Sequence, residues 1–408
     1  MKAFILAAGE GTRIRPLTAN TPKPLLLTAG KPFLLHTIES LKKSGIKDIT
    51  ILVGWKGKRI EEFFGNGKKF GVKINYLTQE QRLGTAHAIG KGKNLFKGDF
   101  ICINGDVIVV PGIIKELVKY SKKAPSNIMV LSKVANPKDY GVITLKGDKV
   151  VKIEEKPSRP RSDLVNTGIY LFRKGIFDLI KKTPKSQRGE YEITTTLEMI
   201  MKKKKLFGFV SKSDWIDIGK PWDLLEANRI LMEGLKKNIK GTVEKGVTLK
   251  GAVVVEKGAL IKSGTYIEGP AIICSGAVIG PNSYLRGSTT IGPGSKVGGA
   301  SEVKNSVIMA NTNVPHHNYV GDSIIGEYCN LGSGTKVANL RLDEGNIKVV
   351  LKGEYVDTGR RKLGVIMGDN VKTGINASIE VGTIIGEDSF IGPGTVAKGT
   401  YLPGSRIT

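Results

Sequence analysis

Residues 6–26, LAAGEGTRIRPLTANTPKPLL, combine glycines, cations and prolines in a pattern that suits phosphate binding. Gly9 and Gly11 follow a short apolar run, and because glycine lacks a Cβ atom, its backbone N–H groups can closely approach phosphate oxygens. Arg13 comes next, and Lys23 stands between two prolines that restrict its backbone. Two cations beside such a turn predict a site for a polyanion, and the spacing matches neither a Walker loop nor a dinucleotide-binding fingerprint.

Aspartates and histidines elsewhere in the chain have the chemistry to complete a reaction centre. Asp106 ends the run ICINGD and Asp217 lies in WIDIGKPWDL, and carboxylates are ligands that Mg²⁺ prefers. The alternative for either aspartate is a turn former or a helix cap. The segment VPHHNYVGD holds His316 and His317, and histidine can accept a proton near neutral pH. The alternative for this pair is a solvent-facing or structural role.

The elements that must position these residues change character near residue 230. Up to that point short apolar strands alternate with amphipathic helices, which is typical of a mostly parallel sheet with helices on both faces and a site at the carboxyl ends of its strands. We expect strands near 48–53, 73–77 and 100–103 and helices near 32–44, 111–122 and 222–237. His36 and His87 fall on expected helices, and we interpret both as structural.

Beyond residue 240 an aliphatic residue recurs every six positions. The uninterrupted series is Leu249, Val255, Ile261, Ile267, Ile273, Ile279, Leu285, Ile291, Val297 and Val303. The period resumes at Ile325, Leu331 and Val337, and again at Ile379, Ile385 and Ile391. Such a period is typical of a hexapeptide β-solenoid, in which each repeat stacks on the next.

Two interruptions of this period, residues 309–324 and 338–364, are interpreted as loops. Repeat proteins carry insertions on a working face, so chemistry is expected there. The chain is therefore predicted to be an α/β protein with a Rossmann-like domain at 1–230, the end of a linker helix at 231–240 and a solenoid domain at 241–408.

Composition supports two globular domains and limits the partners. A chain of 408 residues exceeds what one core usually serves. The formal net charge of +26 suggests phosphate-bearing ligands, but the basic residues are spread along the chain and only 6% of residues are aromatic, which argues against nucleic acid. Apolar runs are shorter than the ~20 residues that span a bilayer, so we expect a cytoplasmic protein without membrane contact. Cys102, Cys274 and Cys329 stand singly in apolar surroundings and are expected to be inert buried thiols.

Residues 6–26 resemble the signature of sugar-1-phosphate nucleotidylyltransferases, which join a nucleoside triphosphate to a sugar 1-phosphate and release pyrophosphate. The attacking phosphate oxygen is already ionised, so this chemistry needs cations and Mg²⁺ more than a strong base. The resemblance implies that Arg13 holds the β- and γ-phosphates and that Lys23 holds the α-phosphate. It also implies that Asp106 and Asp217 are the ligands of Mg²⁺.

The same resemblance assigns residues to the nucleotide and the sugar. Gln79, in TQEQRLGTAHA, matches a position whose amide pairs with the imide edge of uracil or thymine, which favours a pyrimidine nucleotide. The other nucleotide-binding positions are Leu6, Ala8, Gly9, Gly11, Thr12, Gly84 and Thr85. The positions for the sugar and its phosphate are Tyr140, Gly141, Glu155, Lys156 and Asn166. Taken singly, residues of the latter set are ordinary turn formers or strand starts.

VPHHNYVGD resembles the acetyl-transfer motif of the bifunctional enzyme that acetylates glucosamine 1-phosphate and then uridylylates it. By this resemblance His316 is the general base for the amine that attacks the acetyl thioester, and Asn339 positions the amine or polarises the thioester. His317 is expected to face away, because neighbours in an extended chain point opposite ways. The matching positions for the second sugar-phosphate site are Arg286, Lys304, Tyr319, Asn330 and Lys362. Arg360 and Arg361 either meet the phosphates of coenzyme A or are solvated.

The resemblance of the repeats to hexapeptide acyltransferases implies a left-handed parallel β-helix, an acetyl site built between neighbouring β-helices, and a homotrimer. Asp217 stands where the bacterial bifunctional enzyme has Asn, RIRPLTANTPKPLL is closer to glucose-1-phosphate thymidylyltransferases, and the second interruption is longer than the bacterial loop. This combination resembles the archaeal bifunctional sugar-1-phosphate nucleotidylyltransferase / glucosamine-1-phosphate N-acetyltransferase family (GlmU-like). The resemblance covers nearly the whole chain.

The sequence therefore favours a bifunctional enzyme that makes UDP-N-acetylglucosamine from glucosamine 1-phosphate, acetyl-CoA and UTP, with Mg²⁺ as cofactor. UTP or dTTP as nucleotide, and glucose, N-acetylglucosamine or galactosamine as sugar, stay open. One rival is a monofunctional glucose-1-phosphate thymidylyl- or uridylyltransferase whose β-helix only oligomerises or regulates. Another is a catalytically silent regulatory subunit like those of the translation exchange factor, which the retained Arg13, Lys23, Asp106 and Asp217 argue against.

Overall fold

The computed structural model describes residues 1–408, apart from the side chain of Pro111. The chain forms two compact units. The sheet unit comprises Met1–Glu10 and Phe33–Asp217, and the coil unit comprises Gly11–Pro32 and Ile218–Thr408. Segment 11–32, which carries most of the phosphate-binding signature, thus belongs to the coil unit although the residues before and after it build the sheet.

A nine-stranded sheet forms the centre of the sheet unit, in the order β5-β4-β1-β6-β11-β8-β12-β10-β9. Its strands are β1 Lys2–Ala7, β4 Asp48–Val53, β5 Lys73–Thr78, β6 Phe100–Asn104, β8 Asn127–Lys133, β9 Gly141–Lys146, β10 Lys149–Glu155, β11 Leu164–Phe172 and β12 Leu206–Val210. A two-stranded sheet joins β7 Val107–Val109 to β13 Trp215–Asp217. The expected strands near 48–53, 73–77 and 100–103 correspond to β4, β5 and β6.

The sheet is mixed, which corrects the expectation of a mostly parallel one. Strands β5, β4, β1 and β6 run parallel, whereas β11 is antiparallel to β6 and to β8, and β10 is antiparallel to β9 and β12. Strands β9 and β10 are joined by the two-residue turn Gly147–Asp148, and so short a connection can only make an antiparallel pair.

Helices cover the sheet with apolar faces. They are α1 Phe33–Lys43, α2 Gly57–Phe64, α3 Thr85–Gly90, α4 Pro111–Ser121, α5 Ile176–Ile180 and α6 Ile193–Lys202. Side chains of α3, α5 and α6 share one buried cluster with Phe4, Phe100 and Cys102 of the sheet, and α1 packs against α4. The expected helices at 32–44 and 111–122 correspond to α1 and α4.

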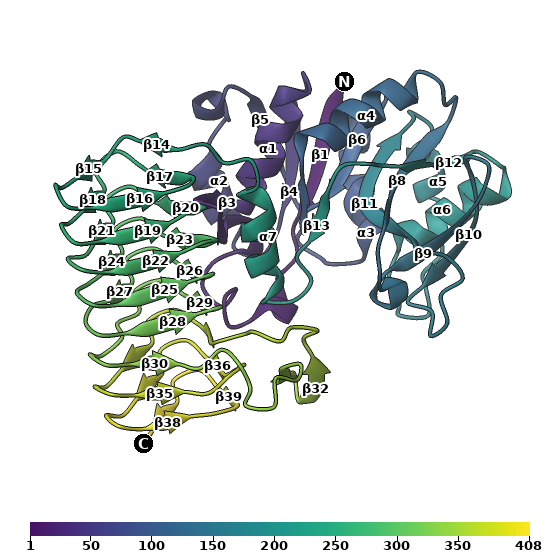
Figure 1. Ribbon diagram of the computed structural model, residues 1–408. Helices are drawn as coiled ribbons and strands as arrows, with labels where there is room; N and C mark the ends of the chain where they lie inside the picture. Colours follow the sequence, from purple (N-terminus) through teal and green to yellow (C-terminus); the bar gives the residue numbers. More distant parts are fainter. The chain divides into compact units, whose positions relative to one another are not determined.

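The coil unit stacks short parallel strands on three sides (Figure 1). The first side comprises β14 Asn238–Ile239, β17 Val253–Val255, β20 Ala271–Ile273, β23 Thr289–Ile291, β26 Val307–Ile308, β29 Ile324–Ile325, β33 Ile366–Met367, β36 Ile384–Ile385 and β39 Thr400–Tyr401. The second side comprises β15 Thr242–Val243, β18 Leu260–Ile261, β21 Val278–Ile279, β24 Lys296–Val297, β27 Asn313–Val314, β34 Lys372–Thr373, β37 Phe390–Ile391 and β40 Arg406–Ile407. The third side comprises β16 Thr248–Lys250, β19 Tyr266–Glu268, β22 Tyr284–Arg286, β25 Glu302–Lys304, β28 Tyr319–Gly321, β30 Lys336–Val337, β35 Ser378–Ile379 and β38 Val396–Ala397.

The hexad residues fill the interior of this coil. Val255 pairs with Ile273 and Ile261 with Ile279, so each turn takes eighteen residues, six for each side. The hexad positions from Val255 onward are fully buried and form one continuous cluster, while Leu249 packs against it. The predicted solenoid of parallel strands is therefore present.

The first predicted interruption, residues 309–324, is not a loop. It contains β27 and β28, which continue the second and third sides in parallel register. Val303 pairs with Val320 after seventeen positions instead of eighteen, because the corner between β25 and β26 is one residue shorter. A second shortening follows between β28 and β29. The shorter corners move the aliphatic residues out of phase without breaking the coil.

The second interruption, residues 338–364, is an insertion with its own hairpin, β31 Lys348–Leu351 and β32 Glu354–Asp357 (Figure 1). An isolated antiparallel bridge between Leu340 and Lys362 closes its base. Ile347 and Val349 are buried, and Thr400 donates a hydrogen bond to the carbonyl of Val350. The insertion is thus ordered by packing on the coil.

Helix α7, Asp223–Leu231, anchors segment 11–32 to the coil. It ends six residues before the expected limit at 237, in a turn with Gly234 at positive φ. The segment itself contains the short helical turns Thr12–Ile14 and Lys23–Leu25 and the strands β2 Leu27–Thr28 and β3 Lys31–Pro32. Ala29 of this segment, Met232, Ile272 and Cys274 form a shared apolar cluster.

The three cysteines are buried free thiols, as expected, and burial raises the pKa of each. No helix in the described part of the chain is both long and apolar enough to cross a bilayer.

Candidate functional site

Two proposed metal ligands of the sheet unit lie on one small β-ladder. Asp106 directly precedes β7, and Asp217, the last residue of β13, pairs in register with Val107, the first residue of β7. Both side chains are half-buried. The described residues include no group of three or more acidic, histidine or cysteine side chains placed for a metal ion. Two carboxylates suffice for Mg²⁺, which usually takes one or two of them with substrate phosphates and water.

The proposed base-reading residue Gln79 follows β5 and is buried. Its Nε2 atom lies 3.2 Å from Nδ1 of His87 on α3. Gly84 and Thr85, at the start of α3, lie beside the segment that begins α6. A Cβ on Gly84 would lie 2.5 Å from the carbonyl oxygen of Tyr191, and the Thr85 hydroxyl accepts a hydrogen bond from the N–H of Ile193. Gly84 is therefore required by a close backbone approach.

The proposed sugar residues gather on three neighbouring strands. Gly141 of β9 pairs with Glu155 of β10, and a Cβ on Gly141 would lie 3.2 Å from the Glu155 carboxylate and 3.8 Å from Cβ of Asn166 on β11. The carbonyl of Tyr140 accepts a hydrogen bond from the N–H of Lys156. The structure thus brings all five predicted positions together.

Trp215 connects this sugar cluster to the carboxylates. Its ring lies edge-on to that of Tyr140 with centroids 5.4 Å apart, and its indole N–H donates to the carbonyl of Thr167. Trp215 is two residues before Asp217 on β13. The Tyr170 hydroxyl accepts a hydrogen bond from Asn166 Nδ2, and burial raises the pKa of Tyr170.

The phosphate-binding turn is compact within the coil unit. Gly11 has φ 69°, and a Cβ there would lie 3.2 Å from Cγ2 of Thr18 and 3.3 Å from Cβ of Lys23. The Thr18 hydroxyl donates to the carbonyl of Gly11. Lys23 is buried to 7% exposure, whereas Arg13 is exposed. Gly11 therefore lets the stem of Lys23 lie against the turn.

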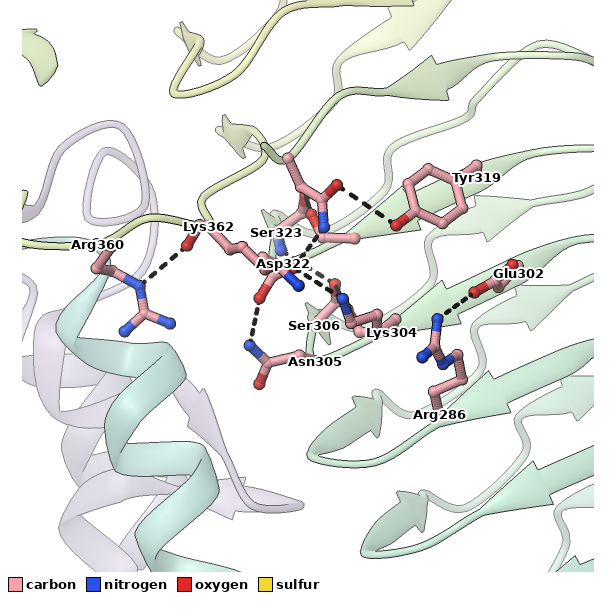
Figure 2. A network of polar contacts seen from close by, with 12 residues as sticks. Arg286, Glu302, Lys304, Asn305, Ser306, Tyr319, Asp322, Ser323, Arg360 and Lys362 are labelled. Carbon is pink, nitrogen blue, oxygen red and sulfur yellow. Dashed lines mark hydrogen bonds and ion pairs between the residues drawn. The ribbon is translucent and has the colours of Figure 1, made fainter. Parts of the chain in front are cut away.

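Residues of the proposed second site meet on the third side of the coil (Figure 2). Arg286 and Lys304 are register neighbours on β22 and β25, and the next rung holds Gly321 in place of a side chain. A Cβ on Gly321 would lie 2.7 Å from Nδ2 of Asn339 and 2.8 Å from the hydroxyl of Tyr319. The missing side chain leaves room for Tyr319 and Asn339 beside two cations.

Asp322 joins Lys304, Asn305 and Asn339 into one network (Figure 2). Its carboxylate accepts hydrogen bonds from Nδ2 of Asn305 at 2.6 Å and Nδ2 of Asn339 at 2.5 Å, and it lies 3.7 Å from Nζ of Lys304. Asn339 Oδ1 in turn accepts from the Tyr319 hydroxyl at 3.4 Å. Asp322 is 3% exposed, so this arrangement compensates a buried charge.

Glu302, beside the network, changes the pKa values of Arg286 and Tyr319. Its carboxylate accepts a hydrogen bond from Arg286 at 3.1 Å, which raises the pKa of the guanidinium. Burial raises the pKa of Tyr319, and the charges of Glu302 and Asp322 raise it further. Tyr319 therefore acts at neutral pH as a phenol that can donate a hydrogen bond.

His316 and Asn330 take other positions on the coil. His316 is exposed at the corner between β27 and β28, and Asn330 forms parallel bridges to Asn313 and Lys372 on the second side. His317 was expected to face away from His316 because the chain was taken to be extended there. The chain is not extended at this point: His317 has φ 50° and lies in the corner turn. Its carbonyl accepts a hydrogen bond from Lys336.

The insertion adds a basic pocket directly after Asn339. A pocket of about 440 Å³ is lined by Leu340, Glu344, Arg360, Arg361 and Lys362. Arg361 forms an ion pair with Glu344, and Arg360 donates to the carbonyl of Lys362. The N–H of Leu363 bonds to the carbonyl of Asn339, so the end of the insertion returns to the network.

Known protein families match both the sheet-forming first part and the coil-forming second part of the chain. The nucleotidyl transferase family model matches residues 2–234, and the GMPPB C-terminal domain model matches residues 267–361. The "Bifunctional protein GlmU" of Methanocaldococcus jannaschii is 44% identical over 393 residues, which cover 96% of this chain and 93% of that protein. The "Bifunctional sugar-1-phosphate nucleotidylyltransferase/acetyltransferase" of Sulfurisphaera tokodaii is 43% identical and covers 98% of this chain and 97% of that protein.

The chain belongs to this bifunctional family. It is an enzyme with nucleotidyltransferase and acetyltransferase activities, and the predicted resemblance to archaeal members is confirmed. A solved glucose-1-phosphate thymidylyltransferase structure from Bacillus anthracis, in complex with sucrose, has a TM-score of 0.53 at 33% identity and covers 56% of this chain and 94% of that one. The monofunctional rival is not favoured, because the bifunctional relatives span nearly the whole chain.

Several residues that contact the proposed site positions were not predicted from the sequence. Asp322 and Gly321 lie inside the VPHHNYVGD motif, but residue type alone did not distinguish them from ordinary turn formers. His87 was interpreted as structural, and its contact with Gln79 depends on the loop between β5 and α3. Trp215 precedes the quoted Asp217 by two residues, but its contact with Tyr140 joins positions 75 apart in the chain.

Proposed function

We propose that this enzyme transfers the acetyl group of acetyl-CoA to glucosamine 1-phosphate and then the uridylyl group of UTP to the resulting N-acetylglucosamine 1-phosphate, with release of pyrophosphate. The observation that carries the proposal is the network of Lys304, Tyr319, Asn339 and Asp322, with Arg286 beside Lys304 on the next strand. It lies on a coil whose bifunctional relatives match the chain over nearly its whole length. A coil that served only for oligomerisation would have no need of two neighbouring cations beside a buried carboxylate.

For uridylyl transfer, Gln79 would read the base, and Arg13 and Lys23 would hold the triphosphate. The other proposed nucleotide contacts are Leu6, Ala8, Gly9, Gly11, Thr12, Gly84 and Thr85. Asp106 and Asp217 would hold Mg²⁺, which supplies positive charge to the triphosphate. The sugar cluster of Tyr140, Gly141, Glu155, Lys156 and Asn166 would place the attacking phosphate. Cations stabilise the charge that develops on the leaving pyrophosphate.

For acetyl transfer, Arg286 and Lys304 would hold the sugar phosphate, because they are adjacent cations on one side of the coil. Tyr319 would contact the sugar, and Asn339, fixed by Asp322, would position the amine or the thioester carbonyl. His316 would remove the proton from the attacking amine. Lys362 would also face the sugar phosphate, while Arg360 and Arg361 of the same basic pocket would accept phosphates of coenzyme A.

The positions of Asn330 and Arg286 on different sides of the coil support a site that needs two copies of the chain. A left-handed parallel β-helix packed as a homotrimer would bring the second side of one copy to the third side of another. The domains would then be the nucleotidylyltransferase at 1–230, the linker at 231–240 and the β-helix at 241–408.

The test separates the two reactions. Release of free CoA from acetyl-CoA, with glucosamine 1-phosphate as acceptor, is compared between the native chain and His316→Ala, with His317→Ala as the matched control. Loss in His316→Ala alone, with pyrophosphate release from UTP and N-acetylglucosamine 1-phosphate intact, supports the proposal. Lys23→Ala or Asp106→Ala should show the reverse pattern. A native chain that releases pyrophosphate but no CoA would reduce the coil to a scaffold.

A further inference from the structure

The insertion hairpin reaches the phosphate-binding turn within the coil unit. Nζ of Lys352, at the hairpin tip, donates a hydrogen bond to the Thr12 hydroxyl at 3.1 Å. Thr12 lies between Gly11, whose backbone makes the turn, and the exposed cation Arg13. The hairpin comes from the acetyltransferase half of the sequence, 340 positions away.

The position of Lys352 is determined by buried contacts at the hairpin base. A Cβ on Gly382 of the coil would lie 2.6 Å from Cγ2 of Ile347 and 3.0 Å from Cγ1 of Val349, so these side chains pack closely on the coil. The Thr358 hydroxyl donates to the carbonyl of Ile347 and holds the second strand to the first. Four register pairs then connect β31 to β32 up to the tip.

The tip itself is unfavourable for a lysine. Lys352 and Gly353 form the two-residue connection between Leu351 and Glu354, with φ 53° and 83°. Two positive φ angles define a type I′ turn, which prefers Asn or Gly at its first position. A side chain with a Cβ in the left-handed region is uncommon in general, but this chain has the same conformation at Lys56, Lys156 and Lys204, so the case for Lys352 depends on its contact with Thr12.

Three cations therefore surround one short turn: Lys23 along Gly11, Arg13 within the turn and Lys352 on Thr12. Like charges gathered around backbone N–H groups favour an anion with several charges. Among the described residues, Thr12 is the one recorded partner of the Lys352 ammonium, and an ammonium has three hydrogens to donate.

We infer that Lys352 is a nucleotide-binding residue of the first site, which contacts the terminal phosphates of the nucleoside triphosphate together with Thr12 and Arg13. The inference rests on the proposed uridylyl transfer at this turn. It assigns to the insertion a role in the reaction of the other half of the chain. The Lys352 ammonium should strengthen binding only of nucleotides with more than one phosphate. A lysine that merely supported the turn would affect all nucleotides equally.

The variant Lys352→Asn removes the cation while it introduces the residue that a type I′ turn prefers before Gly353, so the hairpin should remain folded. Lys348→Asn, on the exposed start of β31, is the matched control. Calorimetric titration with UTP, UDP and UMP in the presence of Mg²⁺ measures binding without turnover. We expect the Kd of UTP to rise about tenfold in Lys352→Asn, that of UDP to rise less and that of UMP to stay unchanged, because an exposed charge-assisted contact is lost.

An unchanged Kd for UTP would overturn the inference. So would an equal rise for all three nucleotides, which would mean that Lys352 only supports the turn. A rise for Lys348→Asn equal to that for Lys352→Asn would point to nonspecific surface charge and overturn it as well. If the native chain neither binds UTP nor releases pyrophosphate, the proposed function fails, and that outcome is distinguishable because it precedes any comparison of variants.

Discussion

Gln79 Nε2 lies 3.2 Å from His87 Nδ1, so the amide proposed to read the nucleobase is held by a neighbouring imidazole. Burial lowers the pKa of His87 below 6.5, and the charge of Lys91 lowers it further. His87 is therefore neutral at pH 7. With its proton on Nε2, its Nδ1 accepts a hydrogen bond from the Gln79 amide and leaves Gln79 Oε1 to face the base.

This contact predicts that His87→Ala weakens base selection. The freed Gln79 amide can rotate, so we expect the KM of UTP to rise about fivefold and the preference for UTP over ATP to fall, through loss of one hydrogen bond. Pyrophosphate release measured with both nucleotides checks this. Acetyl transfer serves as the control, and an unchanged ratio of the two kcat/KM values would contradict the prediction.

The lowered pKa of His87 also predicts a pH dependence. As the pH falls, His87 is protonated in the unfolded chain before it is protonated in the folded chain, because its folded pKa is the lower one. The stability that neutral His87 contributes is therefore present above the unfolded pKa of 6.5 and is lost as the pH falls through the folded pKa. The difference in Tm between the native chain and His87→Ala should therefore shrink between neutral pH and about pH 5.5. Thermal unfolding at both pH values measures it, and a constant difference would contradict this account.

Gly321→Ala should damage acetyl transfer selectively. The new Cβ would lie 2.7 Å from Nδ2 of Asn339 and 2.8 Å from the hydroxyl of Tyr319, so both side chains must move from the network. A displacement of this size typically lowers kcat by about tenfold or more. CoA release measures the loss, and pyrophosphate release should stay at the native level. Gly299→Ala is the matched control, because its nearest neighbour would be 3.6 Å away.

Asp322→Asn should also impair the second site, because it weakens the contacts of Asp322 with Lys304 and Asn339. It removes the charge that faces Lys304 at 3.7 Å and weakens the hydrogen bond that fixes Asn339. We expect the kcat of acetyl transfer to fall about tenfold and stability to fall by about 1–3 kcal/mol, because Lys304 loses its buried counterion. Asp343→Asn, in an exposed ion pair with Arg341, should leave stability nearly unchanged because solvent screens that pair. Equal effects of the two variants would refute the assignment.

The repeat and the local motifs were readable from the sequence because each depends on near neighbours. One aliphatic residue per six positions specifies the stacked coil, and the apolar strand before Gly9 indicates the turn that follows. The phase shift after Val303 was misread as a loop, since a corner shortened by one residue leaves no local mark of its own.

Contacts between distant segments were not readable in the same way. The Asp322 network joins Lys304, Asn305, Tyr319 and Asn339, and Lys352 contacts Thr12 across 340 residues. The mixed sheet likewise depends on which strands become neighbours, as β11 does between β6 and β8. Such pairings follow from tertiary packing, which residue types and spacing in one chain do not encode directly.

Asn228 holds the phosphate-binding segment to the coil. It is fully buried on α7, its Oδ1 accepts hydrogen bonds from the N–H of Ala29 and the hydroxyl of Thr290 at 2.8 Å each, and its Nδ2 donates to the carbonyl of Ser288 at 2.8 Å. One side chain thus joins segment 11–32, the helix and two residues of the coil.

Asn228→Ala should therefore lower both stability and nucleotide binding. It leaves the buried Ala29 N–H and the half-buried Ser288 carbonyl without this partner, which costs about 2–4 kcal/mol in the free energy of unfolding. Segment 11–32 carries Arg13 and Lys23, so its loosening should also raise the KM of UTP, while Asn238→Ala on the exposed strand β14 should leave both quantities unchanged. Chemical denaturation and pyrophosphate release measure the two effects. Native stability in Asn228→Ala would show that the segment is held by its apolar contacts with Ile272 and Cys274 rather than by this hydrogen-bonded anchor.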